Sequence, residues 1–259
     1  MRRKTLDLRG KLVVFEGLDF TGKSTQVRIL GRRLRDLGYN VTITREPGGT
    51  AIGEVMRKVI LSDRNTRLLP LSELLLFMIC RAQLWREIVR PALERDDVVL
   101  SSRFRDSSVM YQGYGREISL DLIEQLNDRV TEGKRADVTF LIDLSVEELM
   151  ERKPEVVDRI EKEDRVFYQE VRQGYLKAYG VRANLPLFPE LVKFSFSESV
   201  APSYPETPDD EKVSLNGHFL TRVREGYLRA AARNSHFYVI DGRLPIERIA
   251  EKVAEHLGL

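Results

Sequence analysis

Short apolar runs alternate with longer amphipathic segments along most of the chain. Runs rich in β-branched and apolar residues predict strands at residues 11–16, 40–44, 98–101, 138–142 and 237–240. Between them, apolar positions recur at helical spacing, which predicts helices at residues 24–37, 51–61, 71–85, 120–131, 146–152, 160–179 and 245–257. Strands that alternate with helices are typical of an α/β fold, in which helices flank both faces of a parallel sheet.

One stretch departs from this alternation. Residues 181–216 contain five of the ten prolines and have no clear helical period. Such a segment predicts an inserted loop. We therefore expect a single domain over residues 1–259 that carries an insertion at about 181–216.

Composition narrows the possible partners. The 42 lysines and arginines nearly balance the 40 acidic residues, so a net charge of +2 gives no basic field for nucleic acid. A single cysteine, Cys80, excludes an internal disulfide framework and fits a cytoplasmic location. The apolar run after the basic N-terminus is too short for a signal peptide or a bilayer span, so we expect no membrane association.

The sequence GLDFTGKSTQ begins at Gly17 and contains a phosphate-binding pattern. Gly17, Gly22, Lys23 and Ser24 fit G-x-x-x-x-G-K-[ST], and they lie between a predicted strand and a predicted helix. Backbone N–H groups of such a loop close around phosphates, the lysine reaches the β- and γ-oxygens, and the serine can bind Mg²⁺. The expected ATP-binding residues are Gly17, Leu18, Asp19, Phe20, Thr21, Gly22, Lys23, Ser24 and Thr25, with Ser24 as the metal ligand. A glycine turn without nucleotide is the less favoured interpretation.

Two further stretches suggest a second phosphate and a base. In TREPGGT (residues 44–50), Arg45 can present a guanidinium to an anion, and the glycines allow close backbone approach; a surface turn is the alternative. In LLLFMICRAQ (residues 74–83), Phe77 and Arg81 are four positions apart and share a helix face. They could stack on a base and bond its edge, although an aromatic residue in such a leucine-rich helix is more often part of the core.

Together with SSRFRDSSVMYQG (residues 101–113), these motifs resemble the thymidylate kinase family, which phosphorylates dTMP to dTDP with ATP. The resemblance covers most of residues 11–180 and resumes near residue 217. It implies a P-loop α/β fold with a flexible lid, Mg²⁺ as cofactor, and a homodimer.

The resemblance also implies roles for individual residues. Phe77 matches the aromatic residue that stacks on the base, and Arg81 matches the arginine that reads the thymine carbonyl. Arg103 matches the arginine that bridges the phosphates, and Asp19 matches the carboxylate near the sugar 3′-hydroxyl. Tyr111 matches the ring that disfavours ribonucleotides. The expected dTMP-binding residues are Asp19, Arg45, Phe77, Arg81, Arg103, Ser107, Ser108, Tyr111, Gln112 and Tyr175.

Two positions depart from the family pattern. The family has an Asp-Arg pair where this chain has Ser102 and Arg103, so the carboxylate expected near Mg²⁺ is replaced by a hydroxyl. At Phe20, one branch of the family has a catalytic arginine and another has glycine together with arginines in the lid. Since charge on the transferring phosphoryl group must be neutralised, we expect a lid arginine to act here.

The lid is expected at residues 150–164, MERKPEVVDRIEKED, because DRIE within it resembles the family sequence just after the lid. The catalytic candidates are Lys23, Arg103, Arg152 and Arg159, and for Arg152 an ordinary surface helix is an almost equal alternative. The segments at 167–178 and 219–230 resemble each other, and each resembles the helix that follows the lid. Tyr175 in the first copy is favoured over Tyr227 in the second, because its distance from DRIE matches the family.

These observations predict a kinase that transfers the γ-phosphoryl group of ATP to dTMP. Two alternatives remain open from the sequence. One is a related nucleotide kinase with another acceptor, and the other is a nucleotide-binding regulatory paralogue with little turnover, suggested by Ser102 and the sparse lid.

Overall fold

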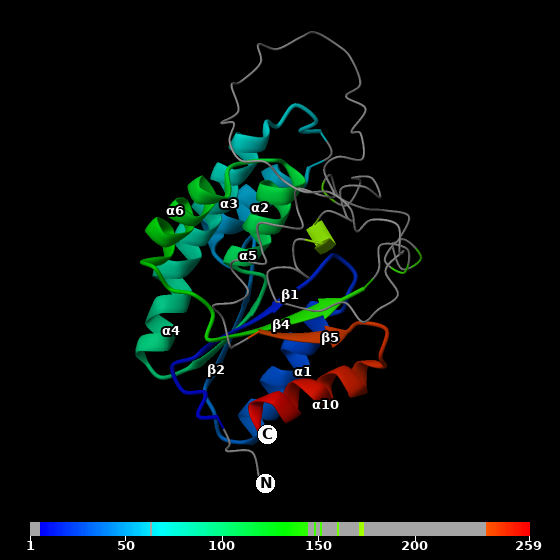
Figure 1. The fold of residues 1–259 in the computed structure, drawn as a ribbon. Coiled ribbons are helices and arrows are strands. Elements are labelled where there is room, and N and C mark those ends of the chain that lie inside the picture. Colours follow the sequence, from blue (N-terminus) through cyan, green and yellow to red (C-terminus); the bar gives the residue numbers. More distant parts are fainter. Residues whose placement is uncertain are drawn as a thin grey trace.

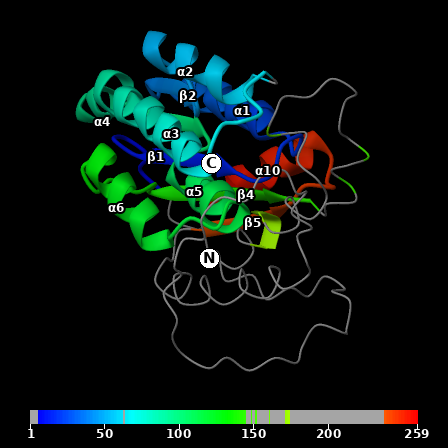
Figure 2. The same cartoon turned by 90° about the horizontal axis from the view of Figure 1, so that it is seen from above.

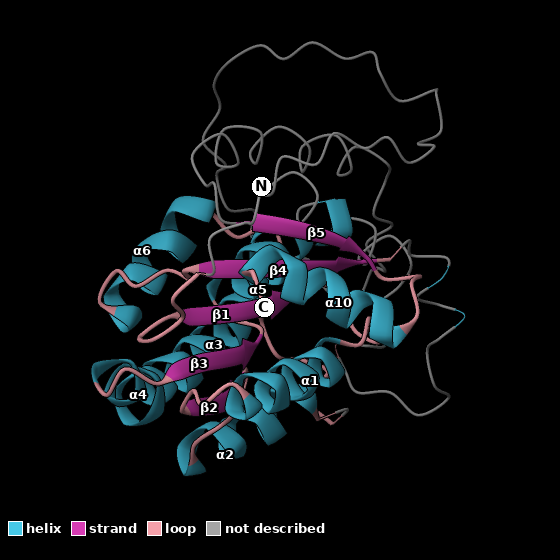
Figure 3. Cartoon of the chain, turned by 90° about the horizontal axis from the view of Figure 1, so that it is seen from below, coloured by secondary structure: helices cyan, strands magenta, loops and turns pink. Residues whose placement is uncertain are grey.

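A computed structural model describes residues 6–62, 64–144, 148, 151, 160, 171–173 and 237–259. Its centre is a five-stranded parallel sheet in the order β2-β3-β1-β4-β5, seen from one side in Figure 3. The strands are β1 (Leu12–Glu16), β2 (Val41–Arg45), β3 (Val98–Ser102), β4 (Val138–Asp143) and β5 (Phe237–Asp241). The predicted α/β fold with a parallel sheet is confirmed.

Helices cover both faces of this sheet (Figures 1 and 2). The α-helices are α1 (Lys23–Asp36), α2 (Ala51–Leu61), α3 (Pro70–Leu84), α4 (Arg90–Glu94), α5 (Arg105–Ser108), α6 (Leu120–Thr131) and α10 (Ile246–Leu257). Two π-helical segments, η1 (Trp85–Val89) and η2 (Val109–Gly115), continue α3 and α5. Among the described residues, no helix is long and apolar enough to cross a membrane.

The central strands are buried on both faces, which explains their continuous apolar runs. All five residues of β1 are buried. Val13 and Phe15 face a cluster that includes α1 and α10, whereas Leu12 and Val14 face a second cluster with the end of α3 and η1. Alternate residues of a strand point to opposite faces, so each β1 side chain joins one of two cores. This strand therefore fixes where the following loop, residues 17–22, begins.

The predicted elements differ from the observed ones mainly where helices change their winding. The helix expected at 71–85 is α3, but the chain continues through η1 into α4, which the sequence analysis missed. Pro91 has no N–H and its ring obstructs the preceding turn of an α-helix, and the wider π turn accommodates this. The short α5 and η2 were also missed. Of the helices expected at 146–152 and 160–179, Glu148, Glu151 and residues 171–173 are helical, Ile160 lies in a turn, and the rest lie outside the described residues.

Candidate functional site

The loop at residues 17–22 joins β1 to α1 and is shaped by its glycines. Gly17 has a φ of 136°, and a Cβ atom there would lie 2.4 Å from the carbonyl oxygen of Ile142. Gly22, the N-cap of α1, is in the left-handed region with a φ of 92°. Side chains would be strained at both positions. The loop thus leads straight into the N-terminus of α1, whose N–H groups favour anions.

Lys23 folds back over this loop. Its Nζ atom donates to the carbonyl oxygen of Leu18 and lies 3.5 Å from Oγ1 of Thr21. The residue is 6% exposed, so its charge is held at the base of the site rather than in bulk water. The lysine lies beside the loop, as the G-x-x-x-x-G-K-[ST] pattern requires, and its contact with nucleotide phosphates stays a prediction.

A cavity of about 350 Å³ opens beside the loop. It is large enough for the reacting parts of small-molecule substrates. Its lining comes from the loop and α1, from the ends of β2 and β3, and from α2, α3, α5 and η2. The lining residues are Asp19, Phe20, Gly22, Lys23, Ser24, Thr25, Arg45, Glu46, Pro47, Arg57, Leu61, Phe77, Ser102, Arg103, Ser107, Tyr111, Gln112 and Ile160.

Asp19, Arg103 and Tyr111 form a polar cluster in this cavity. Nη2 of Arg103 lies 2.6 Å from Oδ1 of Asp19 and 3.0 Å from the hydroxyl of Tyr111, and that hydroxyl lies 3.1 Å from Oδ2 of Asp19. The guanidinium also lies 4.9 Å from the centre of the Tyr111 ring. Burial opposes the charge of Asp19, but Arg103, Lys23 and the hydrogen bonds outweigh it and lower its pKa. The carboxylate is therefore ionised and paired at neutral pH.

The position of Arg103 depends on the end of β1. Arg103 has a φ of 73°, a conformation that strains residues other than glycine. Glu16, fully buried, accepts from the N–H of Phe104 at 2.9 Å and from the hydroxyl of Ser107 at 2.7 Å. Nη1 of Arg103 donates to Ser107 at 3.1 Å. These bonds hold the turn after β3 so that the guanidinium of Arg103 faces the cavity.

Two further arginines reach the cavity from β2 and α2. Arg45 is paired with Glu54 at 2.9 Å, and the same carboxylate accepts from the N–H of Gly49 at 2.8 Å. Arg57 was missed by the sequence analysis; it is half-buried and its Nη1 donates to the carbonyl oxygen of Pro47 at 2.9 Å. The signal for it is weak, because a single arginine in an amphipathic helix is usually a surface residue.

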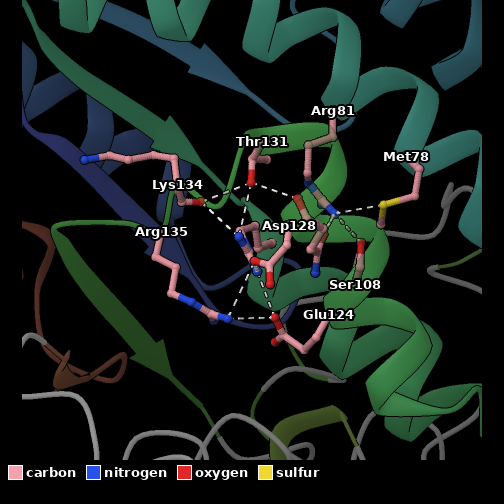
Figure 4. A network of polar contacts seen from close by, with 10 residues as sticks. Met78, Arg81, Ser108, Glu124, Asp128, Thr131, Lys134 and Arg135 are labelled. Carbon is pink, nitrogen blue, oxygen red and sulfur yellow. Dashed lines mark hydrogen bonds and ion pairs between the residues drawn. The ribbon is translucent and has the colours of Figure 1, made fainter.

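Phe77 and Arg81 point to different environments, although they share a helix. Phe77 is half-buried and lines the cavity. Arg81 is 1% exposed, does not line the cavity and contacts Ser108 at 3.0 Å in the network of Figure 4. The remaining partners of its guanidinium are Glu46 at 2.6 and 2.8 Å, Asn127 at 2.6 Å, the carbonyl oxygen of Phe104 at 3.0 Å and the sulfur of Met78 at 3.8 Å.

All five N–H donors of Arg81 are thus directed at protein acceptors in this arrangement. The reading of a base edge by Arg81 stays a prediction. Ser108 is also buried, and its hydroxyl accepts a hydrogen bond from Arg81. It does not line the cavity. The same network includes Glu124, labelled in Figure 4, which accepts from Arg105 at 2.8 Å and so fixes the start of α5 against α6.

Gln112 lines the cavity and has one buried acceptor atom without a partner among the described residues. Its Nε2 atom donates to Glu73 at 2.8 Å, and this fixes the orientation of the amide. Gln112 is 1% exposed, and its Oε1 atom has no hydrogen-bond partner in the part of the chain that the structure describes. Buried polar atoms are normally paired, so an unpaired acceptor at a cavity wall suits a ligand that donates.

Three sequence-predicted site residues, Arg152, Arg159 and Tyr175, lie outside the described residues, as does most of the expected lid. The insertion at 181–216 and the repeat at 219–230 lie outside them too. Within the described residues, no group of three or more His, Cys, Asp or Glu side chains could hold a metal ion. Ser24 and Ser102 both line the cavity and offer hydroxyls only.

A parallel sheet with this loop at the end of β1, followed by a buried lysine and a helix N-terminus, defines a P-loop nucleotide-binding protein. A sequence model described as thymidylate kinase matches residues 15–186. The chain belongs to the thymidylate kinase family.

Individual relatives agree with this assignment. The chain is 43% identical to a thymidylate kinase of Pelotomaculum thermopropionicum over 172 residues, which cover 65% of this chain and 80% of that protein. It is 44% identical to one of Thermosipho africanus over 173 residues, which cover 66% of this chain and 86% of that protein. The solved structure of thymidylate kinase from Ehrlichia chaffeensis matches with a TM-score of 0.62 and 28% identity, over 96% of this chain and 98% of that one.

Proposed function

We propose that this protein transfers the γ-phosphoryl group of ATP to the phosphate of dTMP and releases dTDP and ADP. The observation that carries the proposal is that one cavity holds two phosphate-directed groups. Lys23, directly after the P-loop, and Arg103, directly after β3, both line this cavity, and Arg103 is paired with Asp19 of the loop at 2.6 Å. Family membership supports the same reaction.

Catalysis rests on positioning and on neutralising charge, as in other phosphoryl transfers. Lys23 binds the donor phosphates, and Arg103 bridges toward the acceptor phosphate. Arg45 and Arg57 line the acceptor side and add positive charge there. A lid arginine, Arg152 or Arg159, supplies the charge that Phe20 cannot.

The cavity wall favours a thymine base as the acceptor. Phe77 offers a ring for stacking, and the unpaired Oε1 atom of Gln112 suits the N3–H donor of thymine. Cytosine has an acceptor at that position and would leave Oε1 facing a second acceptor. A site of this kind rejects a ligand that cannot complete the hydrogen bond. Tyr111 lines the cavity with its hydroxyl bonded to Asp19, and this supports the role that the family resemblance implies for its ring, crowding a ribose 2′-hydroxyl.

Mg²⁺ fits this site as an ion carried by the nucleotide. The hydroxyl of Ser24 is exposed to the cavity at the first turn of α1, and the neutral Ser102 replaces the carboxylate of the family pattern. Mg²⁺ commonly binds through few protein ligands together with substrate phosphates. When bound, the ion neutralises phosphate charge. Ser24 would hold it, and the phosphates would supply the remaining ligands.

The acceptor is tested by measuring ADP release with Mg²⁺-ATP and a panel of dTMP, dUMP, dGMP and dCMP. We expect kcat/KM for dTMP to exceed that for dCMP by on the order of 10²-fold or more. The Gln112→Leu variant, which removes the acceptor atom, should lose much of this preference. Equal use of dCMP and dTMP by the unmodified protein would contradict the assigned base, and a preference for dGMP would favour a related kinase with another acceptor.

A regulatory paralogue is the second candidate, and Ser102 is the observation that favours it. A protein without the metal-side carboxylate could bind both nucleotides and turn over slowly. Calorimetric binding of dTMP and ATP without ADP release at any Mg²⁺ concentration would support that candidate.

We also propose that the enzyme is a single-domain, cytoplasmic homodimer. Ile52, Val55 and Val59 on α2, and Leu71, Leu75 and Ile79 on α3, are each between 37% and 54% exposed. Their helical spacing places each set in one stripe, and α2 packs against α3. A second copy of the chain would cover such an apolar surface.

Sedimentation tests the dimer. Val55→Glu should shift the protein toward the monomer, whereas Leu37→Glu, on an exposed leucine at the end of α1, should not. A monomeric unmodified protein at micromolar concentration would contradict the proposal. The nucleotide substrates and the single buried thiol of Cys80 support the cytoplasmic location.

A further inference from the structure

Phe20 holds a strained backbone conformation in the phosphate-binding loop. Its φ is 59°, in the left-handed region that bulky side chains rarely adopt. The neighbouring turns of the loop use Gly17 and Gly22 for positive φ angles. A side chain in this region costs on the order of 1 kcal/mol relative to glycine. Glycine at position 20 would avoid this cost, so the ring has to contribute something that glycine cannot.

The ring of Phe20 lines the cavity and has apolar neighbours. Phe20 is half-buried, lines the cavity and packs against an apolar cluster that includes Leu18, Tyr111 and Ile160. Asp19, directly before it, contacts Arg103, and Thr21, directly after it, contacts Lys23. An aromatic side chain therefore lines the same cavity as Lys23 and Arg103, on the loop whose neighbouring residues contact both.

An aromatic wall matters here because water is a competing acceptor. In hydrolysis, a water oxygen forms the new bond to the γ-phosphorus, the bond to the bridging β,γ-oxygen breaks, and ADP leaves with inorganic phosphate. A polar side chain at this position would hold water by hydrogen bonds, whereas a phenyl ring holds none. Excluding water also strengthens the attraction between the phosphates and their cationic partners.

We propose that Phe20 is a positioning residue that excludes water from the γ-phosphoryl group, so that transfer to the acceptor prevails over hydrolysis of ATP. This inference rests on the proposed phosphoryl transfer. The side chain acts through its apolar surface and carries no charge to the reaction. Its strained backbone is maintained because the packing of the ring and the loop bonds around it fix the conformation.

Phe20→Gly and Phe20→Leu test the inference as a matched pair, since glycine removes the apolar surface and leucine keeps it. ADP release is measured without acceptor, and the ratio of dTDP to ADP is measured with dTMP. We expect Phe20→Gly to raise acceptor-free ADP release about tenfold and to lower the product ratio, while Phe20→Leu keeps a ratio close to that of the unmodified protein. Fluorescence of Trp85, the only tryptophan, verifies that both variants fold.

If Phe20 has a purely structural role, Phe20→Gly should slow ATP hydrolysis and transfer to dTMP in parallel, so that the ratio of dTDP to ADP stays unchanged. That result would overturn the inference. The two proposals fail in different ways. If the unmodified protein forms no dTDP, the proposed function is wrong. The role of Phe20 can still be tested in that case, by comparing ADP release without acceptor between the variants and the unmodified protein. If Phe20→Gly releases ADP no faster than the unmodified protein without acceptor, the water-excluding role of Phe20 is wrong.

Discussion

Replacing Arg81 with methionine should destabilise the protein severely. The change removes a guanidinium that is 1% exposed and paired at 2.6 Å with Glu46, which is itself 2% exposed. Methionine keeps most of the side-chain length, so the loss is mainly of charge and hydrogen bonds. Removing one partner of a buried ion pair leaves the other charge uncompensated, at a cost of about 3–5 kcal/mol. A domain has only about 5–15 kcal/mol of stability in total.

Urea unfolding followed by the fluorescence of Trp85 measures this loss, because that side chain is buried in the core beside the end of α3. The matched control is Arg86→Met. Arg86 pairs with Glu132 at 2.7 Å, but both side chains are about half exposed, so the loss should stay below about 1 kcal/mol.

A double-mutant cycle with Glu46→Gln completes the test. Burial raises the pKa of Glu46 and outweighs the opposing effect of Arg81, so a carboxylate without its partner is especially costly. The double variant should therefore lose clearly less stability than the sum of the two single changes. Additive losses, or a loss in Arg81→Met no larger than in the control, would refute the reasoning. If folded Arg81→Met also loses dTMP use while ATP affinity is kept, the predicted reading of the base by Arg81 is supported.

Three further predictions concern charge at and around the site. Burial and the charges of Glu16 and Glu124 raise the pKa of Asp106 to about 7. Between about pH 4 and pH 7 the folded protein therefore binds a proton that the unfolded chain does not, so the free energy of unfolding falls as pH rises through that window. Asp106→Asn should therefore gain on the order of 1–3 kcal/mol over the unmodified protein at pH 8 but little at pH 4, and a difference independent of pH would contradict this. Ser102→Asp should lower the Mg²⁺ concentration for half-maximal activity several-fold, and identical Mg²⁺ titrations would count against the metal argument. Arg152→Ala or Arg159→Ala should lower kcat by about 10³ with little change in either KM; if both keep a near-normal kcat, the arginine comes from elsewhere.

The sequence predicts this fold well because its decisive signals are local. Each strand is a short apolar run, and the buried β1 predicted from residues 11–16 appears at Leu12–Glu16. The signal for the P-loop is equally local, because Gly17, Gly22 and Lys23 lie close together in the sequence and shape the same loop. The π-helical continuation of α3 was missed because it depends on how Pro91 is accommodated, which apolar periodicity does not report.

The candidate site is less predictable because its contacts are distant in sequence. Helical spacing places Phe77 and Arg81 on one face, but it does not reveal that Arg81 turns to Glu46 and Asn127 instead of the cavity. Arg57 was missed for the same reason, because only the packing of α2 beside the turn after β2 brings it to the cavity. The unpaired Oε1 atom of Gln112 could not be predicted either, because it depends on the bond of Nε2 to Glu73 and on burial by residues distant in sequence.

The central claim is that one cavity, lined by both Lys23 and Arg103, serves a direct transfer between two bound nucleotides. Its most direct test is to supply ATP labelled in the γ-phosphoryl group together with dTMP and Mg²⁺, and to follow the label. The account predicts that the label appears in dTDP in a one-to-one ratio with ADP. Label that stays in ATP or appears only in inorganic phosphate, although both nucleotides bind, would contradict the account.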